Sequence, residues 1–136
     1  MRYLADVNVL VAWAWQSHTS HDRVENWIES LQKQSGSVLL TCAITELGFL
    51  RVSLQIPGYF IDIVTAQTAL SSMKRAHSVT HEFVADNISG SELPIWAKTP
   101  RQITDGHLIQ VAAATNAQLA SLDRGIPGAF LIPFCS

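Results

Sequence analysis

Short, unbroken apolar runs that alternate with longer segments of helical periodicity are the feature that most constrains how this chain folds. The runs "YLA", "SVLLT" and "QLASL" carry no charge and are too short for a stable helix. Runs of this kind are typical of strands buried on both faces, as in parallel sheets covered by helices. The sequence therefore predicts an α/β protein, a three-layer α/β/α sandwich around a short, mainly parallel central sheet.

The segments between these runs have the spacing of helices. In "SHDRVENWIESLQKQ", apolar residues recur at i, i+3, i+4 and i+7 from Val24 to Leu31, which indicates an amphipathic helix. We expect helices over 7–15, 20–34, 43–55, 64–76 and 105–116, and strands over 3–5, 37–41, 79–85, 117–123 and 129–134. Thr104 is expected to cap the last helix after a loop over 87–102, and residues 1–136 are expected to form one domain.

Composition and charge exclude several classes of protein. The chain of 136 residues is 48% hydrophobic and 15% charged, which argues against disorder. Its net charge of -2 argues against a polybasic nucleic-acid binder, although a local basic rim is compatible with that total. Asp6 interrupts the only stretch that resembles a signal peptide, and no run reaches the roughly 18 apolar residues of a membrane helix. We therefore expect a soluble, cytoplasmic protein with no membrane partner.

Four acidic residues are expected near one edge of the predicted sheet. Ligands of open parallel sheets bind beyond the carboxyl ends of the strands. Asp6 and Asp123 directly follow predicted strands, Glu46 lies one turn into a helix, and Asp105 opens another. Buried carboxylates repel one another, and a hard divalent cation such as Mg²⁺ removes that repulsion. Such a site supports phosphodiester hydrolysis, whereas the alternative is that each acid only caps a helix.

Other kinds of site find little support. His18 and His21 precede a predicted helix and His77 and His81 flank the start of a predicted strand, so none forms an HxxxH pair on a helix and a zinc site is not expected. His107 is expected to face solvent, with a contact to substrate as the alternative. Motifs of hydrolase triads, phosphate-binding loops and dinucleotide folds are absent from the sequence.

The remaining acids are expected on the surface. Asp22 lies in the first turn of a predicted helix, where a negative charge suits the helix dipole. Glu25 lies on the polar face of the same helix, and Asp86 lies near a strand end. Solvation is the expected state of all three.

Four segments, "YLADVNVLVAW", "TELGFLRV", "ITDGHLIQVAAATNAQLASLD" and "RGIP", resemble the ordered motifs of PIN-domain ribonucleases. The resemblance is strongest to VapC-type toxins of bacterial toxin–antitoxin systems and extends over essentially the whole chain. It implies cleavage of RNA with Mg²⁺ or Mn²⁺ and a homodimer. It also implies inhibition by a cognate antitoxin that reaches into the acidic pocket.

The resemblance also implies a role for individual residues. Asp6 matches a direct metal ligand, Glu46 the acid of the helix after the second strand, and Asp105 the aspartate of the TD motif. The last family aspartate, which often acts through water or is replaced, corresponds to Asp123. Polar groups that support the first and third aspartates correspond to Asn8 and Thr104.

These assignments lead to a mechanistic hypothesis. Asp6 and Asp105 anchor Mg²⁺, and the other two acids complete the pocket. An RNA-binding rim is expected from four basic residues, each of which is equally consistent with ordinary surface charge: Arg51, Lys98, Arg101 and Arg124. Trp96 is expected either to stack on an unpaired base or to pack on the domain or a partner.

One departure and two alternatives stay open at this point. Gly106 occupies a place where the family more often has Ala; it lowers helix propensity or gives the backbone room beside the metal. A haloacid-dehalogenase-like phosphatase also has an aspartate after its first strand, but in a D-x-D pattern whose second position is Asn8 here. The other alternative is a PIN module that binds RNA or a partner without turnover.

Overall fold

The computed structural model describes residues 1–76 and 79–135, so that His77 lies outside the described residues. The strands are β1 (Arg2–Ala5), β2 (Val38–Thr41), β3 (Thr80–Phe83), β4 (Gln118–Ser121) and β5 (Phe130–Leu131). The helices are α1 (Val7–Ala14), α2 (His21–Gln32), α3 (Ala43–Leu54), α4 (Ile63–Lys74) and α5 (Pro100–Ala114), with a short 3₁₀ turn at Gly90–Glu92. Every strand and helix predicted from the sequence is present within a few residues of its expected place.

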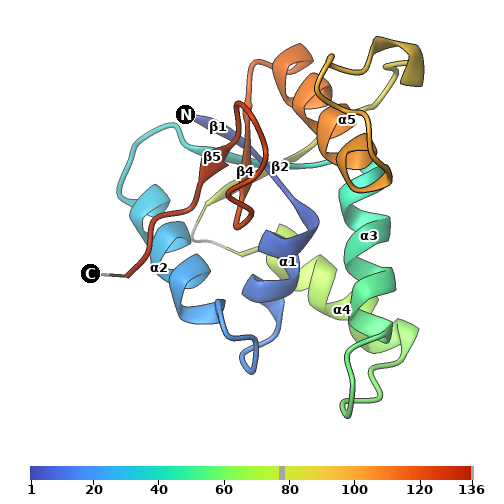
Figure 1. Ribbon diagram of the computed structural model, residues 1–136. Helices are drawn as coiled ribbons and strands as arrows, with labels where there is room; N and C mark the ends of the chain where they lie inside the picture. Colours follow the sequence, from blue (N-terminus) through green and yellow to red (C-terminus); the bar gives the residue numbers. More distant parts are fainter. Residues whose placement is uncertain (77–78, 136) are drawn as a thin grey trace.

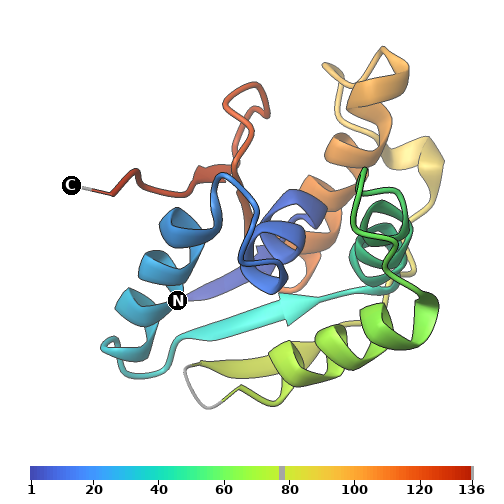
Figure 2. The same cartoon turned by 90° about the horizontal axis from the view of Figure 1, so that it is seen from below.

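The five strands form one sheet in the order β3-β2-β1-β4-β5, and every neighbouring pair is parallel. Figure 2 shows β2 between β1 and β3. The chain changes direction across the sheet at β1, which pairs with β2 on one side and β4 on the other. A crevice beyond the carboxyl ends of the strands is expected at such a switch point.

Two apolar layers cover the sheet. Tyr3 and Ala5 belong to a core shared with α1 and α2, whereas Leu4 belongs to a second core shared with α5. Because successive side chains of a strand point to opposite faces, this division places α1 and α5 on opposite sides of β1 (Figure 1). The predicted three-layer α/β/α sandwich with a parallel sheet is therefore confirmed.

A close approach between α1 and α3 fixes the helix that follows β1. Gly48 of α3 faces Val7, and a Cβ atom at Gly48 would lie 2.5 Å from Val7 Cγ2. No side chain larger than hydrogen fits there without a shift of Val7 or of the helix. This contact sets which face of α3 meets α1, and hence where the side chains of α3 point.

The start of α5 differs from the prediction. The helix begins at Pro100, and Thr99 is its N-cap, so the loop expected to extend to residue 102 ends earlier. Gln102 Oε1 accepts a hydrogen bond from the Thr99 backbone N–H at 3.2 Å, and proline suits the first helical position. Thr104 is thus inside the helix and exposed, and the prediction that it caps α5 was wrong.

Among the described residues, no helix has the length and apolar character needed to cross a bilayer.

Candidate active site

Asp6 lies where β1 ends and α1 begins. Its backbone N–H donates to the Ala120 carbonyl of β4 at 3.0 Å, which continues the sheet by one bond. Its side chain caps α1, because Oδ1 accepts from the Val7 N–H at 2.8 Å. The residue is only 6% exposed. Burial raises the pKa of the Asp6 carboxyl above its ordinary value, hydrogen bonds from Ser121 and Val7 oppose that rise, and the charge of Asp123 adds to it.

The Ser121 hydroxyl connects three parts of this edge. Ser121 Oγ donates to Asp6 Oδ2 at 2.7 Å, and it accepts from Asn8 Nδ2 at 3.2 Å and from the Asp123 N–H at 3.0 Å. One donated and two accepted bonds use the full capacity of a hydroxyl. Asn8 Oδ1 in turn accepts from the Leu122 N–H at 3.2 Å. Asn8 therefore reaches Asp6 through Ser121, a residue that sequence reasoning missed because a serine at a strand end gives no pattern.

Asp105 and Asp123 lie near Asp6. Burial raises the pKa of Asp105, and so do the charges of Asp6 and Asp123, whereas Arg101 one turn earlier lowers it. Asp123 Oδ1 accepts from the Gly125 N–H at 2.7 Å, which holds that loop. A cavity of about 290 Å³ is lined by these three acids and Asn8, together with Val7, Val11, His18 and Val52. Three of the four predicted acids thus share one cavity.

Glu46 has a different environment. Its Oε2 accepts from Thr41 Oγ1 at 2.6 Å and pairs with Lys74 Nζ of α4 at 2.9 Å. His81 Nε2 lies 2.7 Å from the same Thr41 hydroxyl. Because Gly48 faces α1 and successive helical residues are rotated by about 100°, Glu46 points away from the cavity that holds Asp6. The structure therefore does not bring Glu46 together with the other three acids.

The four basic residues predicted for the rim are spread over the surface. Arg101 lies near the acids, since its charge acts on Asp105. The guanidinium of Arg124 lies 5.2 Å from the centre of the Phe134 ring, near the C-terminal segment. Arg51 and Lys98 are exposed, as is Thr104.

The segment before α5 is clamped onto that helix. His107 Nε2 bonds to Asp86 Oδ2, and both side chains are 13% exposed. Burial raises the pKa of Asp86, but the hydrogen bonds from His107 and the Ile88 N–H and the charge of His107 together outweigh burial, so the pKa is lowered. The expectations of a solvent-facing His107 and a solvated Asp86 were therefore wrong.

At Gly106, a Cβ atom would lie 2.7 Å from Ala97 Cβ, so the missing side chain makes room for this segment and not for a metal. Trp96 packs partly buried against the core under α5.

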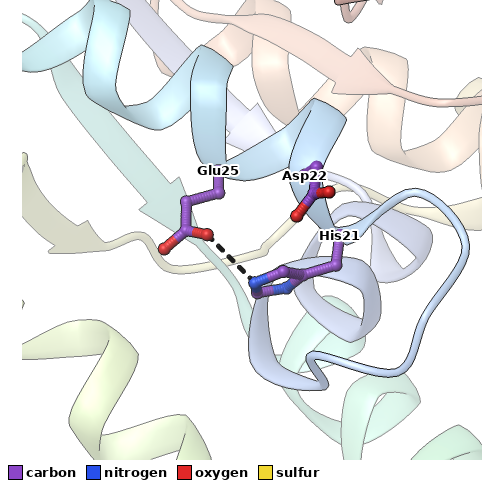
Figure 3. Close-up of side chains that lie close together, drawn as sticks. All are labelled: His21, Asp22 and Glu25. Carbon is purple, nitrogen blue, oxygen red and sulfur yellow. Dashed lines mark ion pairs between the residues drawn. The ribbon is translucent and has the colours of Figure 1, made fainter.

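A second group of possible metal ligands lies at the start of α2 (Figure 3). Among the described residues, only His21, Asp22 and Glu25 have three ligand atoms within 4.8 Å of one another. His21 Nε2 is 3.0 Å from Glu25 Oε2, and Nδ1 is 2.8 Å from the Ala12 carbonyl of α1. Both ring nitrogens therefore have partners, and the contact between His21 and the Ala12 carbonyl joins α2 to α1. Glu25, expected to be solvated, is half-exposed and ion-paired.

A family model for the PIN domain matches residues 3–129. This chain belongs to the PIN-domain family. Within that family, Ribonuclease VapC38 of Mycobacterium tuberculosis is 34% identical to this PIN domain over 127 residues, which cover 90% of this chain and 86% of that protein. Ribonuclease VapC44 of the same species is 32% identical over 130 residues, 93% of this chain and 89% of that protein. The predicted likeness to VapC-type ribonucleases is confirmed, and the phosphatase alternative was wrong.

Two solved structures share the fold of this PIN domain. VapBC2 from Rickettsia felis, solved bound to a DNA fragment from its promoter, has a TM-score of 0.59 and 17% identity over 99% of this chain and 100% of that chain. Mycobacterium tuberculosis VapC20, described as a Sarcin-Ricin loop cleaving toxin, has a TM-score of 0.58 and 12% identity over 94% of this chain and 88% of that one. At these identities the likeness concerns the fold alone.

The donor set of this PIN domain suits a hard divalent cation. Each Asp6 oxygen accepts one hydrogen bond, so lone pairs remain free on both. The charge of Asp123 raises the pKa of Asp6, and the charges of Asp6 and Asp123 raise the pKa of Asp105, which Arg101 partly offsets. Mg²⁺ takes oxygen ligands and is commonly held by one or two carboxylates and several waters.

Proposed function

We propose that this PIN domain is a Mg²⁺-dependent endoribonuclease, with Mn²⁺ as a substitute, and the toxin of a type II toxin–antitoxin system. The observation that carries the proposal is the cavity shared by Asp6, Asp105 and Asp123. The charges of Asp6 and Asp123 repel that of Asp105, and a bound cation would relieve this repulsion. The names of the relatives agree with this activity: VapC38 and VapC44 are called ribonucleases.

In this proposal Asp6 and Asp105 hold the ion, and Asp123 completes the pocket directly or through water. A bound divalent ion lowers the pKa of a water and offsets the charge that develops at the phosphorus during hydrolysis. Ser121 positions the Asp6 carboxylate by donating to its Oδ2, and Asn8 orients that serine by donating to Ser121 Oγ. Thr104, beside Asp105, is a candidate for the supporting hydroxyl.

Glu46 enters the reaction under one condition. Its carboxylate has to leave Lys74 and Thr41 before it reaches the cation or a water bound to it. In the state described here, Glu46 lies outside the residues that line the acidic cavity. Its contribution to turnover is therefore expected to be smaller than that of Asp6 or Asp105.

RNA is expected to meet the acidic cavity along a rim that includes Arg101. This residue lies one turn before Asp105, so its guanidinium is close to where the phosphate would bind. Arg51, Lys98 and Arg124 are further candidates for this rim. Neutralising any of them is expected to weaken binding and to reduce its dependence on salt.

We also propose an antitoxin and a second copy of this chain as protein partners. Exposed apolar side chains gather on α3 and α4, at Leu47, Leu54, Ile63 and Val64. Contiguous apolar surface of this kind marks sites of protein association. VapBC2, whose structure resembles this fold, was solved bound to a DNA fragment from its promoter. We place the complex in the cytoplasm, where RNA is available.

The proposal is tested with purified protein and a set of structured and single-stranded RNAs, in Mg²⁺, in Mn²⁺ and in EDTA. Cleavage that needs the ion and is lost in Asp105→Asn is the expected result. Equal cleavage by the wild type and by Asp105→Asn would contradict the proposed site. Binding of RNA by a folded wild type that cleaves no RNA in either ion would favour the PIN module without turnover.

A further inference from the structure

A second cavity lies next to the acidic one. It has a volume of about 410 Å³, and its walls include the apolar side chains of Trp15, Ile56, Pro57 and Tyr59. His18 lines this cavity and also the acidic cavity, as do Val11 and Val52. The two cavities therefore adjoin at these three residues along one side of the molecule, which we call the groove, and a volume of this size is typical of small-molecule sites.

The walls of the second cavity are held by contacts outside it. Trp15 Nε1 donates to Ser53 Oγ of α3 at 2.9 Å, and its ring stacks on Phe49 with 6.1 Å between centroids. After α3, Gly58 adopts a φ of 83°, a conformation that favours glycine, and the chain turns there. Tyr59 follows this turn and is 58% exposed. One aromatic wall is thus fixed, and the other remains accessible.

His18 presents a hydrogen-bond donor between the two cavities. Its Nδ1 accepts from the Ser20 backbone N–H at 3.0 Å, which places the proton of the neutral ring on Nε2. Burial lowers the pKa of His18, and the nearby His21 lowers it further, so the neutral ring is favoured. Within residues 1–76 and 79–135, the His18 ring makes hydrogen bonds through Nδ1 alone. Nε2–H is therefore free to donate to a ligand in the groove.

We propose that the second cavity is a nucleobase subsite, where Tyr59 stacks on one base of the RNA and His18 Nε2–H donates to an oxygen of that nucleotide. The inference rests on the proposed function, because the phosphodiester has to lie in the acidic cavity for its neighbour to reach this one. Unpaired bases are bound by stacking on aromatic side chains and by hydrogen bonds to their edges. Gln55, which also lines the cavity, supplies a donor and an acceptor for such an edge.

The cavity favours a base over a protein side chain because of this mixture of groups. A purely aliphatic pocket suits an apolar residue of a partner, whereas His18 and Gln55 would be left without partners by such a residue. A single strand that crosses the acidic cavity also delivers its next nucleotide to the adjoining part of the groove.

The test uses a random-sequence, single-stranded RNA pool in Mg²⁺, with sequencing of the new ends. The variants are Tyr59→Ala, Tyr59→Phe and His18→Ala, and Phe60→Ala is the matched control because Phe60 is 94% exposed and outside both cavities. We expect the wild type to prefer certain bases at one position beside the cut. Tyr59→Ala should flatten that preference and lower kcat/KM at favoured sites about 5- to 50-fold, the effect of losing one stacked base. Tyr59→Phe and Phe60→Ala should keep the preference.

A binding measurement separates failure of the subsite from failure of the nuclease. The same pool, with 4-thiouridine in place of uridine, is irradiated with the protein in EDTA, and crosslinked peptides are mapped. Crosslinks at Trp15 or Tyr59 without any cleavage in Mg²⁺ would support the subsite and contradict the proposed function. Cleavage with the same base preference in wild type, Tyr59→Ala and His18→Ala would overturn the subsite and leave the nuclease standing. Loss of antitoxin binding in Tyr59→Ala, with cleavage and base preference unchanged, would overturn it in favour of a protein side chain.

Discussion

Carboxylates at the carboxyl edge of the sheet occupy two environments that differ in their counter-charges: a first group of three aspartates, and Glu46 by itself as the second. Asp6, Asp105 and Asp123 line one cavity, where burial and the charge of Asp123 raise the pKa of Asp6, and burial and the charges of Asp6 and Asp123 raise the pKa of Asp105. Glu46 lies beyond the end of β2 and has a cation, Lys74, at 2.9 Å. The first group needs a positive charge from elsewhere, whereas the second already has one.

This difference teaches that position at the edge of a parallel sheet does not by itself define a metal site. The side chain also has to lack a cationic partner and to face a cavity that solvent reaches. Asp6 and Asp105 line the cavity and form no ion pair within the described residues, although the charge of Arg101 acts on Asp105, whereas Glu46 pairs with Lys74 and does not line it. Neutralising Asp6 or Asp105 on the one hand and Glu46 on the other tests this difference, and Ser121→Ala tests the hydroxyl that connects the first group.

The largest expected effect is on turnover. Asp6→Asn and Asp105→Asn should each lower kcat/KM on RNA by about 10³-fold, as removal of one stabilising group at a reacting phosphate does. Glu46→Gln should cost about tenfold, because Glu46 contacts Lys74 and Thr41 and not the cavity. The measurement is kcat/KM in Mg²⁺ for all three variants. An equal loss in Glu46→Gln would show that this side chain turns into the cavity during the reaction.

A smaller effect is expected at the buried hydroxyl that connects the first group. Ser121→Ala should lower the free energy of unfolding by about 1–3 kcal/mol, because Asn8 Nδ2 and the Asp123 N–H lose their acceptor. Ser37→Ala is the matched control, since Ser37 Oγ is buried with no hydrogen-bond partner among the described residues. Urea unfolding should show Ser37→Ala to be neutral or slightly stabilising. Equal destabilisation by both variants would mean that the Ser121 network adds nothing beyond packing.

The smallest expected effect is on the free energy of unfolding at neutral pH in EDTA, which the two substitutions below should change in opposite directions. Asp105→Asn should stabilise the protein by about 0.5–1 kcal/mol after allowance for solvent screening, because it removes a repelled charge. Glu46→Gln should destabilise it by a similar amount of about 0.5–1 kcal/mol, because Lys74 loses its partner.

The pH dependence follows from the direction of the Asp105 shift. The folded state holds the Asp105 proton more tightly than the unfolded chain, whose pKa is near 3.8. Wild-type stability in EDTA should therefore fall as the pH rises from that value through the raised pKa of the folded state. Asp105→Asn should show a shallower fall, with the remainder due to Asp6, whose pKa is also raised. Urea unfolding from pH 4 to pH 7 measures both slopes, and identical slopes would contradict the assigned repulsion.

The fold was predictable because its signals are local. Buried strands such as "SVLLT" are unbroken apolar runs, and the helix expected over 43–55 is observed as Ala43–Leu54. The start of α5 was missed because Thr99 and Pro100 are as typical of a loop as of a helix N-terminus. Asp6 and Asp123 were correctly placed near each other because parallel strands end at one edge.

Other parts of the site depend on packing that has no local signal. The direction of Glu46 follows from the contact between Gly48 and Val7, residues 41 positions apart in the sequence. The clamp between His107 and Asp86 joins a helix to a distant loop in the same way. Likewise the second cavity forms where the α1–α2 loop meets the turn after α3, and no periodicity predicts such a meeting.

The most direct test of the central claim is to titrate the protein with Mn²⁺ in the absence of RNA and to measure binding by calorimetry. Wild type, Asp105→Asn, Glu46→Gln and His21→Ala are compared, the last to report on the group at the start of α2. We predict that Asp105→Asn weakens Mn²⁺ binding at least tenfold and that Glu46→Gln and His21→Ala bind it as the wild type does. Normal binding by Asp105→Asn with loss in His21→Ala would contradict the account, because the ion would then bind at α2 and not between Asp6 and Asp105.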